Sequence, residues 1–165
     1  MLQLATFHYT EVLKKKMTGK ELKGIVYSGL YSGIWLGLLF YAIQKLSNRR
    51  LLDFLLNVDF LPLPKDITHN VFLQWTLHLA ISLLLAFALY RAAKARPSLL
   101  LPLSLAINLI VSISFFPLEG ISVEKILQPS LVNVSIWTAG HVLYAWILAS
   151  SLKRTVFKQY NEKPR

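Results

Sequence analysis

The sequence contains no cysteine, which excludes a disulfide scaffold, a thiolate metal site and a cysteine nucleophile. It is also poor in charge, because only 16% of its 165 residues are charged and 55% are hydrophobic. Soluble domains are about 25% charged. Acidic residues are scarce, with 8 Asp and Glu against 18 Lys and Arg, which gives a formal net charge of +10. This composition argues against an ordinary soluble domain and against a disordered chain, which would lack so much apolar material.

Charge is missing altogether from four stretches, at residues 24–44, 67–90, 97–118 and 126–152. Each is at least as long as the roughly 20 helical residues that cross a bilayer core of about 30 Å. Backbone groups in lipid must bond within their own segment, which favours helices. We therefore predict an all-α fold, an integral membrane four-helix bundle in a single domain over 1–165. Its transmembrane helices are expected at 24–45, 70–91, 98–117 and 131–152.

The basic residues predict how the chain is threaded. Thirteen of the 18 lie in the N-terminal segment 1–23, in the short turn near 91–96 or in the tail 153–165. Basic residues concentrate on the cytoplasmic side of membranes. Residues 1–23 and the basic tail 153–165 are therefore predicted to be cytoplasmic, with both termini inside. Because the charges flank apolar runs, the expected partner is the lipid bilayer and not a nucleic acid.

Two segments outside the predicted spans carry local signals. Residues 46–69 form the outside loop, and its stretch 51–61 alternates apolar residues with Asp53, Asn57 and Asp59. That pattern suits either an interfacial helix at the membrane surface or a lid packed on the spans. Thr18 and Glu21 have the spacing of a capping box, which would begin the first helix about a turn before the apolar run. Residues 1–13 could form an amphipathic helix.

Polar residues inside the spans are the candidate functional site. His78 and His141 lie about eight and ten residues from the outside ends of their spans, which places both ~12–15 Å deep. Ionisable groups at such depths are uncommon and usually face the bundle interior. They either satisfy one another as packing contacts or form a protonatable or ligand-binding pocket. The candidate intramembrane polar cluster comprises His78, His141, Asn108, Ser82, Ser112 and Thr138.

Three glycines in the first span, Gly29, Gly33 and Gly37, recur every four residues and form a ridge on one helix face. Small residues at this spacing allow another helix to approach closely. A helix of the same chain is the favoured neighbour. A second copy or another membrane protein is the alternative.

Signatures of catalysis are missing. There is no Gly-rich phosphate loop, no Gly-x-Ser-x-Gly and no His-Glu-x-x-His motif. Two histidines without a neighbouring carboxylate or cysteine fall short of a usual zinc set. We therefore expect no metal, no cofactor and no enzymatic activity.

Three stretches resemble the YagU family of bacterial inner-membrane proteins, whose biochemical activity is unassigned. The stretches are His78 followed by Ser82, the segment 113–120 with Ser114-Phe115-Phe116-Pro117, and Gly140-His141 with Lys153-Arg154 after its helix. The resemblance implies a multi-pass protein of the bacterial cytoplasmic membrane that is linked to acid tolerance, with His78 and His141 at family histidine positions. The chain departs from the family in its shorter outside loop and in having Val111 and Ser112 where a third histidine is expected.

The leading hypothesis is therefore a small inner-membrane protein that contributes to acid tolerance through its intramembrane histidines. One alternative is a structural or partner-binding subunit that associates through the glycine ridge of the first span. Another is an oligomeric channel or carrier for a small solute, although no inverted repeat relates the two halves of the chain.

Overall fold

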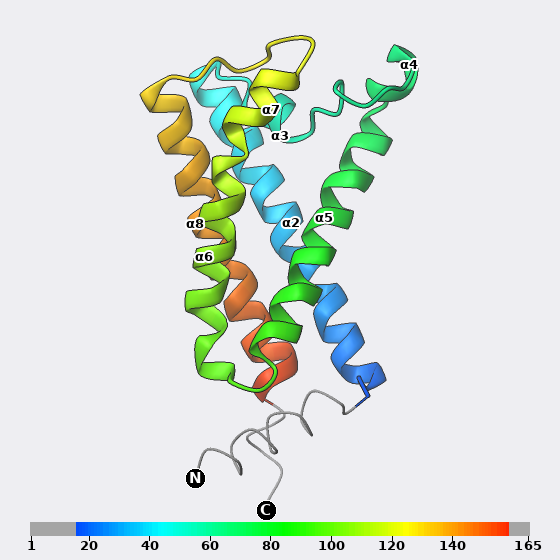
Figure 1. Ribbon diagram of the computed structural model, residues 1–165, viewed down its shortest axis with the longest axis vertical. Helices are drawn as coiled ribbons and strands as arrows, with labels where there is room; N and C mark the ends of the chain where they lie inside the picture. Colours follow the sequence, from blue (N-terminus) through cyan, green and yellow to red (C-terminus); the bar gives the residue numbers. More distant parts are fainter. Residues whose placement is uncertain (1–15, 159–165) are drawn as a thin grey trace, which may run out of the picture.

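A computed structural model describes residues 16–158, and every regular element in that range is a helix (Figure 1). Four helical stretches are long and apolar enough to cross a membrane: Gly19–Ser47, Val71–Ala93, Pro97–Ile121 and Leu131–Phe157. The all-helical fold is thus confirmed, and the four helices able to cross a membrane suggest a multi-pass membrane protein. The predicted amphipathic segment 1–13 lies outside the described residues.

Helix α2, Gly19–Ser47, begins at the predicted capping box. The Thr18 hydroxyl accepts from the Glu21 backbone N–H at 3.2 Å, and the Thr18 backbone N–H donates to the Glu21 carboxylate at 2.6 Å. This cap satisfies two of the helix's unpaired N–H groups and starts it before the uncharged run. The helix ends at Asn48, whose φ of 54° is left-handed.

The third span is interrupted. Helix α5, Val71–Ala93, is followed by a short 3₁₀ turn, η1 (Pro97–Leu99). The third span then consists of two helices, α6, Leu100–Ile113, and α7, Phe115–Ile121. Pro117 explains the break at Ser114, because a proline ring clashes with the carbonyl of the residue four positions earlier, which is Ile113 here. The span therefore continues past residue 117 as a second helical piece.

The C-terminal span extends past the end of its uncharged run. Helix α8, Leu131–Leu152, begins with the Ser130 hydroxyl accepting from the Asn133 N–H at 3.2 Å. It continues without a break into a π-helical turn, η2 (Lys153–Phe157). Val156 and Phe157 are buried. The first residues of the predicted basic tail are therefore a helical extension packed on the bundle, because apolar side chains follow the Lys153-Arg154 pair.

The loop at residues 46–69 packs on the bundle as a lid. Its short helices are α3, Leu51–Leu55, and α4, Lys65–Thr68. Leu51 and Phe54 are buried, and the Phe54 ring lies 4.9 Å from that of Phe115 and 5.1 Å from that of Trp137. Of the two interpretations of this segment, the structure favours the lid over an interfacial helix, because its apolar side chains face the bundle.

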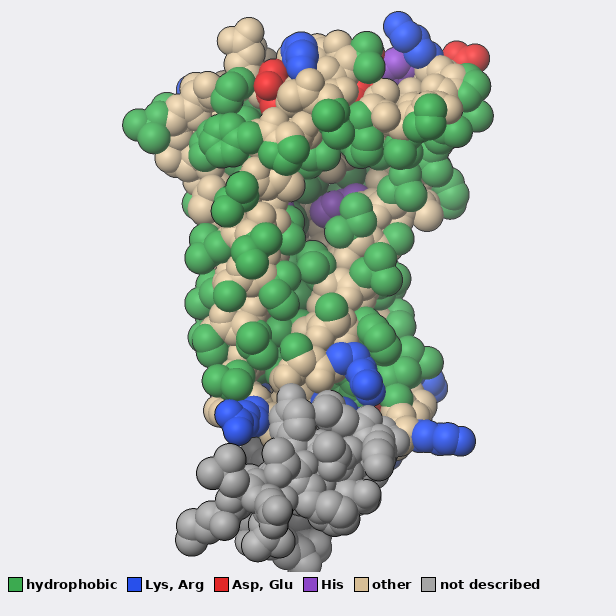
Figure 2. Space-filling model, in the orientation of Figure 1, with side chains coloured by type: hydrophobic (Ala, Val, Ile, Leu, Met, Phe, Trp, Pro, Cys, Tyr) green, Lys and Arg blue, Asp and Glu red, His purple; other side chains and the backbone are tan. Residues whose placement is uncertain are grey.

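Helix α2 occupies the centre and packs against α5 on one side and α8 on the other, while α6 packs mainly against α8 (Figure 1). Helix α5 leans away from α6 toward one end. We call that end, which carries α3, α4 and α7, the loop end. The opposite end carries the start of α2, the turn at η1 and the end of η2, and we call it the basic end. Figure 2 shows a belt between the two ends without Lys, Arg, Asp or Glu on the face in view.

Candidate functional site: the polar interior of the bundle

The glycine ridge of α2 is filled by α5 of the same chain. A Cβ added to Gly29 would lie 3.0 Å from the Leu83 Cα, and one added to Gly33 would lie 2.9 Å from the Ser82 Cβ. At Gly37 the added atom would meet the Trp75 ring. The ridge therefore provides the close helix approach that its spacing predicts, and the favoured neighbour within the chain occupies it.

Close approach brings two α5 side chains onto the carbonyl groups of α2. The His78 Nε2 lies 3.0 Å from the Gly33 carbonyl oxygen, and the Ser82 hydroxyl donates to the Gly29 carbonyl at 2.6 Å. A carbonyl can only accept a hydrogen bond, so Nε2 is the nitrogen that carries the His78 proton. The glycine ridge and the histidine-serine pair thus form one site, which we call the α2–α5 clasp (Gly29, Gly33, His78 and Ser82).

Helix α8 joins this site through Tyr144. The Tyr144 hydroxyl lies 2.8 Å from the Ser82 hydroxyl, and both side chains are buried. Three spans therefore meet at one buried polar group, Ser82. Tyr144 was not among the predicted site residues, although it shares a helix face with His141, three residues earlier.

A second group of hydroxyls joins α2 to the end of α8, nearer the basic end. Ser151 donates to the Ser28 hydroxyl at 2.9 Å, and the Ser28 hydroxyl lies 3.0 Å from that of Thr155. Ser32, one turn along from Ser28, bonds to the Ser28 carbonyl at 2.6 Å. These hydroxyls were not among the predicted site residues either. Their signal was the four-residue spacing of Ser28 and Ser32 and of Ser151 and Thr155.

His141 is buried in aromatic surroundings and has no hydrogen bond to the clasp among the described residues. Its Nδ1 lies 2.9 Å from the Trp137 carbonyl of its own helix, so Nδ1 is the donor. The ring centroid is 4.5 Å from that of Trp137 and 6.2 Å from that of Phe40. No hydrogen bond joins His141 to His78 within residues 16–158. Their matched depth does not bring them into direct hydrogen-bond contact.

The polar stripe of α6 faces α8 and not the clasp. Ser104 donates to the Ala145 carbonyl at 2.9 Å, Asn108 donates to the Ser104 carbonyl at 2.9 Å, and Ser112 bonds to the Leu109 carbonyl. The buried Asn108 Oδ1 accepts no hydrogen bond. Thr138 lines an apolar groove between α6 and α8. The six predicted cluster residues therefore divide between the clasp, the aromatic surroundings of His141 and the α6–α8 contact.

The basic end holds a buried ionisable group. The Tyr90 hydroxyl donates to the Glu21 carboxylate at 2.9 Å, and the Lys94 Nζ lies 5.5 Å from the centre of the Tyr90 ring. All three residues are less than 9% exposed. This contact ties the start of α2 to the end of α5, just as the clasp ties their middles.

Within the described chain no group of three His, Asp or Glu residues is placed to hold a metal ion. The chemistry available in the interior is the donation and acceptance of protons by histidine and hydroxyl groups. Searches of family models, curated proteins and solved structures gave no match to the chain.

Proposed function

We propose that this protein is a small, non-enzymatic, multi-pass protein of the bacterial cytoplasmic membrane, with both termini in the cytoplasm. In this proposal it contributes to acid tolerance by responding to protonation of His78 and His141. The observation that carries the proposal is the hydrogen bond from His78 to the Gly33 carbonyl, which links a titratable group to the contact between two spans. The resemblance of short motifs to the YagU family is the second support.

The clasp is well placed to convert protonation into movement. Helix α5 contacts α2 far more extensively than it contacts α6 or α8, so α2 is its main attachment. Neutral His78 uses Nε2 on Gly33, and a second proton would enter at Nδ1. The added charge would lie inside a bundle whose span residues near it are uncharged, where charge is costly. Protonation would therefore weaken the packing of α5 and favour a different position of this helix.

His141 would respond in a different way. Its Nδ1 proton is used on the Trp137 carbonyl, so a second proton would enter at Nε2. The aromatic rings of Phe40 and Trp137 can stabilise a nearby cation. His141 itself is only 5% exposed and has little access to water. The aromatic packing between α2 and α8 would have to adjust.

Acid survival of cells that depend on the protein tests the proposal. Glutamine keeps an N–H donor for the Gly33 carbonyl but cannot take a charge near neutral pH. We expect the double variant His78→Gln, His141→Gln to survive acid challenge no better than cells without the protein. The matched control is His69→Gln, which removes an exposed histidine that pairs with Glu124 at 2.9 Å outside the spans. Wild-type survival of the double variant would refute the role of the two histidines.

Two alternative functions receive less support. The partner-binding alternative placed its interface on the glycine ridge, and α5 already occupies that ridge. A channel or carrier would require a path through the bundle. Hydroxyl pairs in the interior can relay a proton without a cavity, so proton transport is better supported than solute transport. The pairs are Ser82 with Tyr144 and Ser28 with Ser151. Proton flux into protein-containing liposomes, compared with empty liposomes between pH 4.5 and 7.5, separates conduction from an acid response without conduction.

A further inference from the structure

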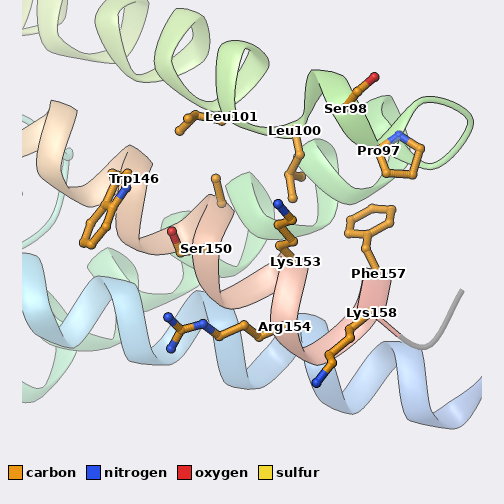
Figure 3. A pocket seen from close by; sticks show the side chains of 11 residues that line it. Pro97, Ser98, Leu100, Leu101, Trp146, Ser150, Lys153, Arg154, Phe157 and Lys158 are labelled. Carbon is orange, nitrogen blue, oxygen red and sulfur yellow. The ribbon is translucent and has the colours of Figure 1, made fainter. Parts of the chain in front are cut away.

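A groove with basic and apolar parts opens between α6 and α8 at the basic end (Figure 3). Its volume is about 770 Å³. Lys153 and Arg154 of η2 and Lys158 just after it line the groove, and Ser98 and Ser150 add hydroxyl groups. Leu100, Ala149 and Phe157 supply apolar walls. We call this the basic groove.

The basic groove continues into an apolar groove along the same two helices. The second groove has a volume of about 830 Å³ and shares Leu101 and Trp146 with the first. Its other walls include Leu105, Val142 and Leu143. Small side chains on α8, among them Ser135 and Ala139, keep it open. The basic groove is thus continuous with the apolar groove on the side of the bundle.

The dimensions fit one leaflet of a membrane. From Trp146 to Val134 the apolar groove follows twelve residues of α8, which is ~18 Å of helix. Half of a bilayer core is about 15 Å. The basic groove begins where the uncharged run of α8 ends, at Lys153, which is the level expected for lipid headgroups.

We propose that the two grooves together bind one anionic phospholipid, with its phosphate in the basic groove and an acyl chain in the apolar groove. Basic pockets between spans are suited to anionic headgroups, and three cations line this one. Within residues 16–158 no carboxylate forms a salt bridge with Lys153 or Arg154. Trp146, which is 57% exposed, lines both grooves and has an indole N–H that can donate to a lipid.

The test measures lipid selectivity in vesicles. The protein is reconstituted in phosphatidylcholine containing a trace of spin-labelled phosphatidylglycerol or spin-labelled phosphatidylcholine, and the immobilised fraction of each label is compared. We expect selective immobilisation of phosphatidylglycerol. The double variant Lys153→Gln, Arg154→Gln should reduce its relative association by about fivefold for each cation removed. Equal immobilisation of both labels by the wild type would overturn the proposal.

A matched variant separates a site from diffuse charge. Lys20→Gln, Lys23→Gln removes two exposed cations from the same end of the molecule but outside the groove. It should retain the selectivity, and an equal loss in both double variants would overturn the site.

A third variant tests the apolar part. Ala139→Leu fills the apolar groove and should lower immobilisation of phosphatidylglycerol, whereas Ala88→Leu on the exposed side of α5 should not. Selectivity unaffected by Ala139→Leu would overturn the acyl-chain position. Size-exclusion profiles of all variants show whether the bundle stays folded.

Discussion

At the scale of single residues, the absence of a side chain at Gly29 and Gly33 has two consequences. It lets α5 approach α2, and it leaves the two carbonyl oxygens open to side chains from α5. Carbonyl oxygens within a helix already accept one bond but have a second lone pair. The buried His78 and Ser82 side chains find their acceptors there, so packing and polar satisfaction depend on the same glycines.

Substitution of Gly33 by alanine is expected to destabilise the bundle by about 1–3 kcal/mol, the range for overpacked interiors. The new Cβ would lie 2.9 Å from both the Cβ and the hydroxyl of Ser82, which a small side chain cannot avoid by rotating. Thermal unfolding in detergent measures the effect. Gly19→Ala is the matched control, because nothing lies within 4 Å of its added atom. It should be neutral or slightly stabilising, since alanine favours helix. Equal stability of Gly33→Ala and the wild type would contradict the close approach.

The glycine spacing was enough to predict close packing, but the hydrogen-bond partners of the histidines could not be predicted from the sequence. Depth along a helix follows from residue counting, whereas the direction in which a residue faces its neighbours depends on how the helices are rotated. His141 and Asn108 show the difference, because both bond to a carbonyl four residues earlier in their own helices. Such an acceptor is always within reach in a helix, so a polar side chain can be satisfied without meeting the other spans.

At the scale of elements, the Gln44 amide joins the end of α2 to α3 through the backbone N–H groups of Leu52 and Asp53 and through the Asp53 carboxylate. Asp53 accepts from the Gln44 amide at 2.9 Å and from Arg50 Nε at 2.8 Å. Burial alone would raise the pKa of the Asp53 carboxyl. The hydrogen bonds from Gln44 and Arg50 and the charges of Arg50 and Lys45 outweigh it, so the pKa is lowered from its ordinary value of 3.8. The charged form of Asp53 therefore contributes to holding the lid.

This shift predicts how the lid responds to acid. A carboxyl with a lowered folded-state pKa contributes stability above its unfolded pKa and loses it as the pH falls through the folded value. We expect the lid to loosen only below about pH 4, and Asp53→Asn to lack this component of the pH dependence. Hydrogen exchange of residues 51–55 between pH 6 and pH 3 measures it.

Asp66→Asn is the control for the lid, because Asp66 is exposed on the same side of the molecule. It should leave the pH profile unchanged. A lid that loosens near pH 5 in both the wild type and Asp53→Asn would assign the acid response to another group. That outcome would favour the histidines as the groups that respond to acid.

The sequence predicted these elements to differing degrees, for physical reasons. The start of α2 depends on side-chain capping at Thr18, a local interaction that spacing reveals. The break at Ser114 depends on Pro117, also local, yet the predicted span treated 98–117 as one piece. Burial of Phe54 and Phe157 depends on contacts far along the chain. An alternation of apolar and polar residues could not distinguish a lid from a membrane-surface helix.

At the scale of the whole molecule, the bundle is held unevenly. The α2–α8 and α6–α8 pairs share extensive contacts, while α5 depends mainly on α2 and leans away at the loop end (Figure 1). The acid response proposed for the clasp uses the α2–α5 contact, which is the main attachment of α5. The lipid grooves lie on the α6–α8 side of the molecule, so the two proposals concern different contacts and can fail independently.

Orientation in the membrane connects the proposals, and the absence of cysteine makes it directly measurable. Val123→Cys introduces a thiol at a 68% exposed position in the connection before α8, and Ser98→Cys introduces one in the exposed turn at the basic end. We expect a membrane-impermeant maleimide to label Val123→Cys in intact spheroplasts and Ser98→Cys only after lysis, because basic ends remain cytoplasmic. The reverse pattern would contradict this orientation. The reverse orientation would also place the lid in the cytoplasm and the basic groove in the outer leaflet. External acid would then no longer reach the bundle from the loop end, where His69 and Asp53 lie.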